Sequence, residues 1–215
     1  MNHTCGANWR AHRDAVLEQA RTIVIKVGSA VLTTEGELDL RVVNSLADQV
    51  AMLHDQNRDI VLVSSGAVSA GRKHLRLGAE GNTLPEKQAS AAVGQSRLMH
   101  GYDEAFERFR KSTAQILLTR DDLCSRHRFL NARNTFATLL VNRVIPIVNE
   151  NDTVVTEEIR FGDNDTLAAL VANLVEADAR ALDCARLNVS DARARFHWAD
   201  ATDWQPDAPL DAVVM

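Results

Sequence analysis

Several features that would set a chain apart from ordinary globular proteins are scarce or missing here. The three cysteines, Cys5, Cys124 and Cys184, are odd in number and scattered, without metal-ligand spacing. This distribution excludes a disulfide framework and a cysteine-based zinc site, and it fits the reducing cytoplasm. No stretch approaches the roughly 18 apolar residues of a membrane-spanning helix, and residues 1–20 hold no apolar run typical of a secretory signal. We therefore expect a cytoplasmic protein without a membrane partner.

An excess of positive charge is also missing. The 215 residues carry a net charge of −5, which argues against nucleic acid as the main partner. The densest basic segment, residues 126–128 followed by Arg133, is short and interrupted, which indicates a solvated helix face or a contact for an anionic ligand. With 46% hydrophobic and 25% charged residues, the chain is long enough for one sizeable α/β domain or two small ones.

Apolar runs alternate with helical patterns along the chain. Residues 22–27 and 59–63 are almost continuously apolar, as in a parallel sheet covered on both faces. Between them, residues 39–56 carry apolar residues at three- and four-residue steps, which predicts a helix. The same alternation predicts strands at 114–118 and 144–148, a loop at 78–86, and helices at 87–109, 131–142 and 166–175. The predicted fold class is α/β, a three-layer sandwich with a mostly parallel central sheet.

Two clusters of acidic and amide residues stand at a strand end and a helix start. Residues 149–152 (Asn-Glu-Asn-Asp) end the predicted strand 144–148, and residues 162–165 (Gly-Asp-Asn-Asp) open the last predicted helix. Small ligands bind at such places in α/β sheets. Local capping is the alternative for each cluster, but it needs one Asp or Asn per helix start, so the surplus favours a site.

The chemistry that these clusters allow remains open on the residues alone. Asp152, Asp163 and Asp165 could bind an ammonium group, organise a lysine, or hold magnesium through water. Asn151 and Asn164 could orient a carboxylate. The sequence therefore indicates either a small zwitterion or a metal–phosphate group as the ligand.

A lysine beside a glycine turn ends the first predicted strand. Lys26 lies in an otherwise apolar run and precedes Gly28-Ser29, where backbone N–H groups can approach phosphate oxygens. The alternative is a lysine that extends from a strand end into water. Neither GxGxxG nor GxxxxGK[ST] occurs, which disfavours dinucleotide-binding and P-loop explanations.

A second strand-to-helix turn has the sequence Ser64-Ser65-Gly66-Ala67. It could offer a hydroxyl and N–H groups to a carboxylate, or it could simply cap the following helix. No histidine–acid pairing suggests that either serine is a nucleophile.

Taken in order, these turns resemble those of the glutamate 5-kinases within the amino acid kinase family. The resemblance covers about residues 21–178 and rests on six segments: 24–29, 63–68, 87–95, 129–133, 146–152 and 162–165. It implies transfer of the γ-phosphoryl group of ATP to the side-chain carboxylate of L-glutamate, the first step of proline biosynthesis. It also implies a homo-oligomer, and magnesium that is carried with ATP rather than held in a protein site.

The resemblance assigns roles to individual residues. It gives catalysis to Lys26, Asp163 and Asp165, nucleotide binding to Lys26, Gly28 and Ser29, and glutamate binding to Ser65, Gly66, Asp152 and Asn164. Because a carboxylate is already a nucleophile, positioning and charge neutralisation would carry most of the catalysis.

The chain departs from the family after Asp178. The family continues there with a buried strand, a Thr-Asp turn and a glycine-rich loop with a second lysine, which build most of the nucleotide site. None is recognisable in residues 179–215, and the usual C-terminal PUA domain is absent too. We therefore expect an N-terminal extension (1–20), the substrate-binding part of the kinase domain (21–178) and a divergent tail without a strand (179–215).

Two origins of the tail remain open. Codons for residues 182–185, shifted by one base, can encode Leu-Ile-Val-Leu, the missing type of strand, so the tail could come from a reading-frame slip. It could equally be a divergent or disordered C-terminus. In either case the nucleotide lobe would be incomplete, and we expect a chain that folds poorly alone or associates, with little or no kinase activity.

Two other functions fit parts of the pattern. One is an amino acid kinase with another acceptor, such as carbamate, aspartate or N-acetylglutamate, although residues 129–133 and 149–152 weigh against it. The other is a non-catalytic fragment that binds glutamate or mediates dimerisation.

Overall fold

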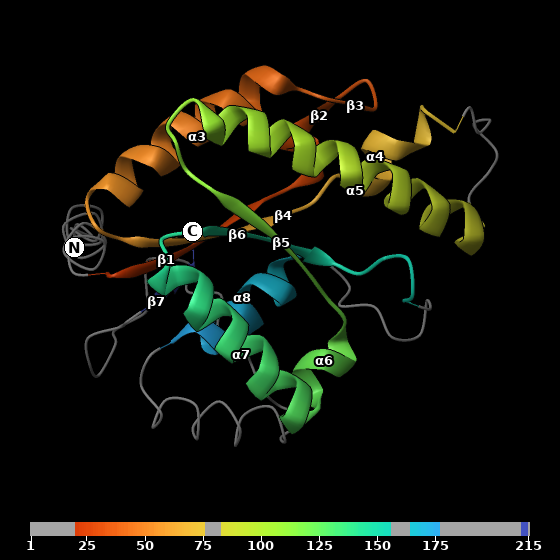
Figure 1. Cartoon of the computed structure of the whole chain (residues 1–215). Helices are drawn as coiled ribbons and strands as arrows, with labels where there is room; N and C mark the ends of the chain where they lie inside the picture. Colours follow the sequence, from red (N-terminus) through yellow and green to blue (C-terminus); the bar gives the residue numbers. More distant parts are fainter. Residues whose placement is uncertain (1–19, 76–82, 156–163, 177–211, 215) are drawn as a thin grey trace, which may run out of the picture.

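The computed structural model describes residues 20–75, 83–155, 164–176 and 212–214. Their core is a five-stranded sheet in the order β5-β6-β4-β1-β7, in which every pairing of neighbouring strands is parallel (Figure 1). The strands are β1 (Thr22–Val27), β4 (Asp59–Ser64), β5 (Thr113–Leu118), β6 (Ile145–Glu150) and β7 (Ala212–Val214). The predicted parallel α/β sheet is therefore confirmed.

Helices cover both faces of this sheet. Helices α3 (Leu40–Asp55) and α5 (Leu84–Glu107) lie on one face, and α7 (Arg126–Val141) and α8 (Asn164–Val175) on the other (Figure 1). Side chains alternate between the faces along β4: Ile60 and Leu62 join one buried cluster, whereas Val61 and Val63 join the other. This double burial explains the continuous apolar runs and confirms the three-layer arrangement.

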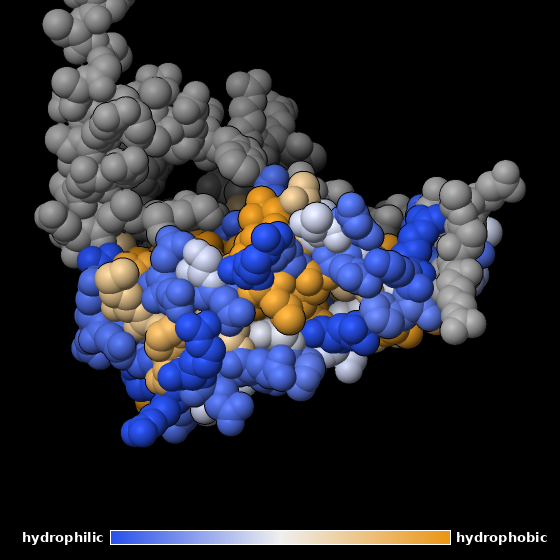
Figure 2. Space-filling view, turned by 90° about the horizontal axis from the view of Figure 1, so that it is seen from above, coloured by the Kyte–Doolittle hydropathy of each residue, from blue (hydrophilic) through white to orange (hydrophobic). Residues whose placement is uncertain are grey.

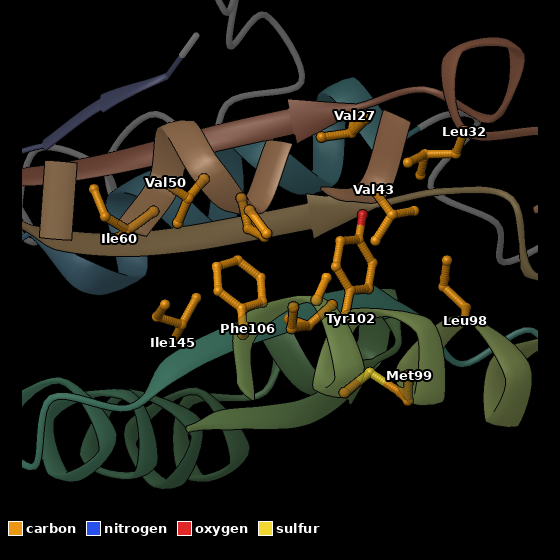
Figure 3. Packing of buried hydrophobic residues seen from close by; sticks show 14 of the residues in the cluster. Val27, Leu32, Val43, Val50, Ile60, Leu98, Met99, Tyr102, Phe106 and Ile145 are labelled. Atoms are coloured by element: carbon orange, nitrogen blue, oxygen red, sulfur yellow. The ribbon is translucent and has the colours of Figure 1, made fainter. Parts of the chain in front are cut away.

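The larger core lies between the sheet and the helices α3 and α5. Tyr102 and Phe106 of α5 reach toward Val43 and Val50 of α3 and toward Ile60 of β4 (Figure 3). All five side chains are at most 1% exposed. Together they pack α5 against α3 and the sheet.

Short elements connect the main ones where strands end. Helices α2 (Ser29–Leu32) and α4 (Ala67–Arg72) follow β1 and β4, and α6 (Arg120–Cys124) follows β5. A small antiparallel hairpin of β2 (Thr33–Thr34) and β3 (Glu37–Leu38) precedes α3. Its turn contains Gly36 with a positive φ of 77°.

Helix α4 packs against α5 at backbone distance. A Cβ atom added to Gly94 of α5 would lie 1.7 Å from the carbonyl oxygen of Ala67, and one added to Gly71 of α4 would lie 1.8 Å from that of Ser90. Glycine is therefore required on both helices at this crossing.

Several predicted boundaries are wrong. Helix α5 begins at Leu84 rather than at 87, because Thr83 and Glu86 form a capping box and Pro85 favours the first turn. Helix α7 begins at Arg126 rather than 131, and α6 was not predicted. Strand β6 runs to Glu150, so Asn149 and Glu150 belong to the strand instead of following it.

The expectation of no strand in residues 179–215 is also wrong for three residues. Strand β7 pairs in parallel with the first half of β1, from Thr22 to Val24. The physical reason is that β1 would otherwise present the unpaired N–H and C=O groups of a sheet edge. The rest of the expected tail and residues 1–19 of the expected extension lie outside the described residues.

Among the described helices, none has both the length and the apolar content needed to cross a membrane.

Candidate active site

The carboxyl ends of three neighbouring strands, β1, β4 and β6, meet the first turn of α8. In a parallel sheet all strands end at the same edge, and ligands bind in the crevice outside it. This edge carries four residues that the sequence analysis selected: Lys26 on β1, Ser65 directly after β4, and Asn164 and Asp165 at the start of α8. Their contacts define two adjacent arms.

The first arm is an ion pair between Lys26 and Asp165. The two atoms Lys26 Nζ and Asp165 Oδ1 are 2.7 Å apart, and the side chains are 28% and 24% exposed. Asp165 stands in the first turn of α8, where a carboxylate is favoured by the helix dipole. At this exposure the pair contributes about 1 kcal/mol or less to stability, so its main effect is to orient the ammonium group at the strand end.

The second arm is centred on the side-chain amide of Asn164. Its nitrogen Nδ2 donates to Ser65 Oγ at 2.6 Å, to Asn149 Oδ1 at 3.2 Å and to the carbonyl oxygen of Ser64 at 3.3 Å. These acceptors come from the ends of β4 and β6, so Asn164 ties α8 to both strands. The amide oxygen lies on the opposite side of Cγ from Nδ2 and is thereby turned away from these acceptors.

The backbone at Gly66 allows Ser65 to take this position. Gly66 has φ 103° and is the N-cap residue of α4, without a side-chain cap. A residue with a Cβ atom would be strained there. The Ser65 hydroxyl is thus used by Asn164 rather than as a helix cap, while the Ser65 N–H donates to the Val27 carbonyl at 3.0 Å.

Gly28 borders the Lys26 ammonium group, and Ser29 follows it in the chain. Gly28 is the N-cap residue of α2, and a Cβ atom added to it would lie 3.6 Å from Lys26 Nζ. Ser29 is exposed and opens α2, where its carbonyl accepts a bond from Thr33. The structure therefore places Gly28 beside Lys26, and Ser29 at the start of the helix that follows β1.

The remaining predicted residues follow β6. Asp152 lies, partly buried, in the turn that leaves the strand. Gln88 of α5 holds this turn by donating to the Val155 carbonyl at 3.2 Å. Asp163 and Gly162 lie outside the described residues. Within the described ranges, no group of three or more His, Cys, Asp and Glu residues could hold a metal ion.

A buried polar network lies beneath the site; the sequence analysis named its members Ser64 and Asn149 but not the partners that hold them, Tyr102 and Gln95. Asn149 is 3% exposed and donates from Nδ2 to Gln95 Oε1 at 2.9 Å. The hydroxyl groups of Ser64 and Tyr102 are 2.9 Å apart, and burial raises the pKa of Tyr102 to about 12. The available signal was Gln95 itself, a polar residue in line with the apolar positions Leu98 and Tyr102 of α5.

The described surface has two hollows, one away from this cluster and one that touches the network beneath it through Gln95. One of about 450 Å³ is bordered by α2 and α3, and one of about 500 Å³ by α5 and β5. The second includes Gln95 and Thr153, but neither includes Lys26, Ser65 or Asn164. Seen from the side of α3 and α5, the surface is largely hydrophilic, with apolar side chains gathered near its middle (Figure 2). We place the candidate site at the strand ends, because charged and amide groups converge there.

Comparisons with known proteins identify the family of this chain. The profile described as "Amino acid kinase family" matches residues 21–181. A curated glutamate 5-kinase of Oleidesulfovibrio alaskensis is 56% identical over 201 residues, which are 94% of this chain and 51% of that protein. One of Maridesulfovibrio salexigens is 60% identical over 168 residues, 78% of this chain and 45% of that protein. A solved carbamate kinase from Giardia is 17% identical with a TM-score of 0.49, covering 72% of this chain and 70% of that one.

The chain thus spans about half the length of the curated relatives that it matches.

Proposed function

This chain belongs to the amino acid kinase family, and on that premise we propose that it is a glutamate 5-kinase chain, which binds L-glutamate as acceptor for the γ-phosphoryl group of ATP. The identity of 56% and 60% to curated glutamate 5-kinases supports this acceptor over carbamate or aspartate. We propose residues 21–178 as the substrate-binding part, and a cytoplasmic homo-oligomer as its working form.

One observation carries the proposal. Asn164 and Asp165 are consecutive residues, yet Asn164 contacts Ser65 at 2.6 Å whereas Asp165 contacts Lys26 at 2.7 Å. A glutamate molecule held at the Ser65–Asn164 arm could therefore place its side-chain carboxylate next to a phosphate held by Lys26. Such adjacency is the arrangement that phosphoryl transfer requires.

The Ser65–Asn164 arm, together with Asp152, supplies complementary groups for the two charged groups on the α-carbon of the substrate. The Ser65 hydroxyl and the backbone at Gly66 can donate to a carboxylate, while the Asp152 carboxylate and the Asn164 amide oxygen can accept from the α-ammonium group. In this orientation the side-chain carboxylate of glutamate points toward Lys26. Because the ammonium group is one of the groups held, acceptors that lack it would bind more weakly.

The chemical step needs little covalent assistance from the protein. An oxygen of the glutamate side chain attacks the γ-phosphorus, and the bond from that phosphorus to the departing ADP oxygen breaks. Lys26, with Gly28 beside it and Ser29 next in the chain, neutralises charge on the transferred group, and Asp165 with Asp163 keeps the lysine aligned. Magnesium supplies further charge neutralisation when bound. Since the described residues offer no cluster of three ligands, it would be held mainly by the phosphates of ATP.

Isothermal titration calorimetry tests the glutamate half directly. We expect L-glutamate to bind the full chain, and Ser65→Ala to weaken binding by about ten- to a hundredfold, since a bond to a charged group contributes roughly 1.5–3 kcal/mol. Aspartate, carbamate and N-acetylglutamate serve as competing acceptors. Equal or tighter binding of any of them would contradict the proposed acceptor.

Nucleotide binding and turnover are tested by calorimetry with ATP and by a coupled ATPase assay. Glutamate binding without ATP binding would support a non-catalytic fragment, the alternative function. Glutamate-dependent ATP turnover above background would contradict the expected loss of the nucleotide lobe.

A further inference from the structure

We propose that Gln95 is a positioning residue for glutamate: by fixing the amide of Asn149, it directs the amide of Asn164 toward the bound substrate. The inference rests on the proposed function and deepens it. Gln95 lies on α5, on the far side of Asn149 from Ser65 and Asn164, and so acts through other side chains. Its position is 7% exposed.

The orientation of the Asn149 amide follows from a donor that cannot be reversed. The backbone N–H of Glu150 donates to Asn149 Oδ1 at 2.9 Å. A backbone nitrogen is always a donor, so the atom facing it must be the amide oxygen. The amide nitrogen of Asn149 therefore faces Gln95, which must present its oxygen in return.

Gln95 Oε1 provides the acceptor that Asn149 needs. Among the described residues, Gln95 Oε1 is the atom that accepts from Asn149 Nδ2, at 2.9 Å. At 3% exposure, water cannot readily replace it. Without this acceptor the Asn149 amide would rotate to satisfy its buried donor, and Oδ1 would leave the Nδ2 atom of Asn164.

Gln95 makes this bond at a cost to itself. Among the described residues its own Nε2 is buried without a hydrogen-bond partner. A buried unpaired donor is unfavourable, and an apolar side chain of similar size would avoid it. The gain lies in orientation: the oxygen of Gln95 holds Asn149, which in turn holds Asn164.

Loss of the Gln95 acceptor would be felt at the Ser65–Asn164 arm. Asn164 Nδ2 has two hydrogens for three acceptors, and Asn149 Oδ1 is one of these. Losing it would leave the strong bond to Ser65 and only the longer contact of 3.3 Å to the Ser64 carbonyl, so the Asn164 amide could turn about Ser65 and move its oxygen away from the ammonium group of glutamate. Glutamate affinity should therefore depend on a residue that the substrate does not touch.

Two variants of Gln95 separate orientation from packing. Gln95→Met keeps the length of the side chain but removes the acceptor, whereas Gln95→Glu keeps an acceptor oxygen for Asn149 whether the carboxyl group is ionised or protonated. Gln49→Met is the matched control, because Gln49 is exposed on α3 and bonds within its own helix to Ser45. In calorimetry with L-glutamate, we expect about tenfold weaker binding for Gln95→Met, which corresponds to roughly 1.4 kcal/mol. Gln95→Glu should stay within about threefold of wild type, and Gln49→Met should be unchanged.

A second measurement needs no ligand. In the free full-length chain labelled with 15N-asparagine, the side-chain amide of Asn164 is assigned by its absence in Asn164→Asp. We expect its hydrogens to exchange with water about tenfold faster in Gln95→Met than in wild type, Gln95→Glu or Gln49→Met. A loss of packing alone would not single out this amide.

The outcomes separate a failure of the proposed function from a failure of the role of Gln95. If the wild-type chain binds no glutamate, the proposed function fails, and the amide exchange still decides the role of Gln95. Unchanged exchange at Asn164 in Gln95→Met overturns that role. So does a loss of glutamate affinity that is equal in Gln95→Met and Gln95→Glu.

Discussion

The crossing of α4 and α5 allows a sharp test of how the Ser65–Asn164 arm is held in place. We predict that Gly94→Ala destabilises the chain strongly and also weakens glutamate binding. The new methyl group would lie 1.7 Å from the Ala67 carbonyl oxygen and 2.6 Å from the Gly71 nitrogen, both of which belong to the backbone. Since ordinary van der Waals contact begins near 3.4 Å, the helices would have to separate by more than an ångström.

The magnitude follows from two opposing effects. Overpacking of this kind costs about 1–3 kcal/mol and occasionally more, and separation of the helices adds lost contacts. Alanine is better than glycine in a helix interior by about 1 kcal/mol, which offsets part of the cost. We expect a net loss of about 2 kcal/mol in the free energy of unfolding.

The same substitution elsewhere on α5 is the control. An added Cβ at Gly101 would meet the Leu38 Cδ2 atom at 2.7 Å, the far end of a flexible side chain that can move. Gly101→Ala should therefore stay within about 1 kcal/mol of wild type, because the helix propensity gained opposes a small rearrangement. Urea unfolding followed by circular dichroism measures both variants.

Glutamate binding provides the second readout. Helix α4 begins directly after Ser65 and Gly66, so displacing it moves the Ser65 hydroxyl away from Asn164. Calorimetry should show weaker glutamate binding in Gly94→Ala than in Gly101→Ala. A Gly94→Ala chain with wild-type stability would refute the close approach of the two helices.

Three further perturbations probe other parts of the molecule. Burial, with the nearby charges of Arg143 and Lys111, lowers the pKa of His54 below its usual 6.5, so the neutral form is favoured in the folded chain. Stability should therefore fall as the pH drops from 6.5 toward the native pKa, and in urea unfolding this pH dependence should be smaller in His54→Leu than in wild type. Tyr102→Phe removes the hydroxyl that bonds to buried Ser64 and should cost about 1 kcal/mol in the same assay; a stability loss above about 3 kcal/mol would show that more than this bond is broken. Asp165→Asn removes the ion pair with Lys26 but leaves Ser65 in place. Calorimetry should show glutamate affinity within about threefold of wild type, together with a lower affinity for ATP and lower turnover. A large loss of glutamate binding would contradict the separation of the two arms.

Strand positions could be predicted well because burial on both faces leaves little choice of residue. The run 22–27 coincides with β1, and the predicted starts of β4, β5 and β6 lie within one residue of the observed starts. Helix starts were predicted less well. The beginning of α7, Arg126-His127-Arg128, is exposed and has no apolar period, and the start of α5 depends on a capping box that the periodicity does not register.

The site illustrates a similar division. Lys26, Ser65, Asn164 and Asp165 could be selected because each stands at a strand end or helix start. The partners of Asn149 could not be deduced, since its bond to Gln95 joins residues 54 positions apart on different layers. Pairing of buried side-chain amides depends on the tertiary packing of α5 against β6, which no local pattern encodes.

The first turn of α8 has a thermodynamic consequence for the order of binding. Because Asn164 and Asp165 are neighbours on one rigid helix, a displacement of this turn by one ligand alters the contacts offered to the other. The resulting coupling is reciprocal: the factor by which glutamate changes the affinity for phosphate at Lys26 equals the factor by which phosphate changes the affinity for glutamate. Synergy between the two substrates would need no device larger than a single helical turn.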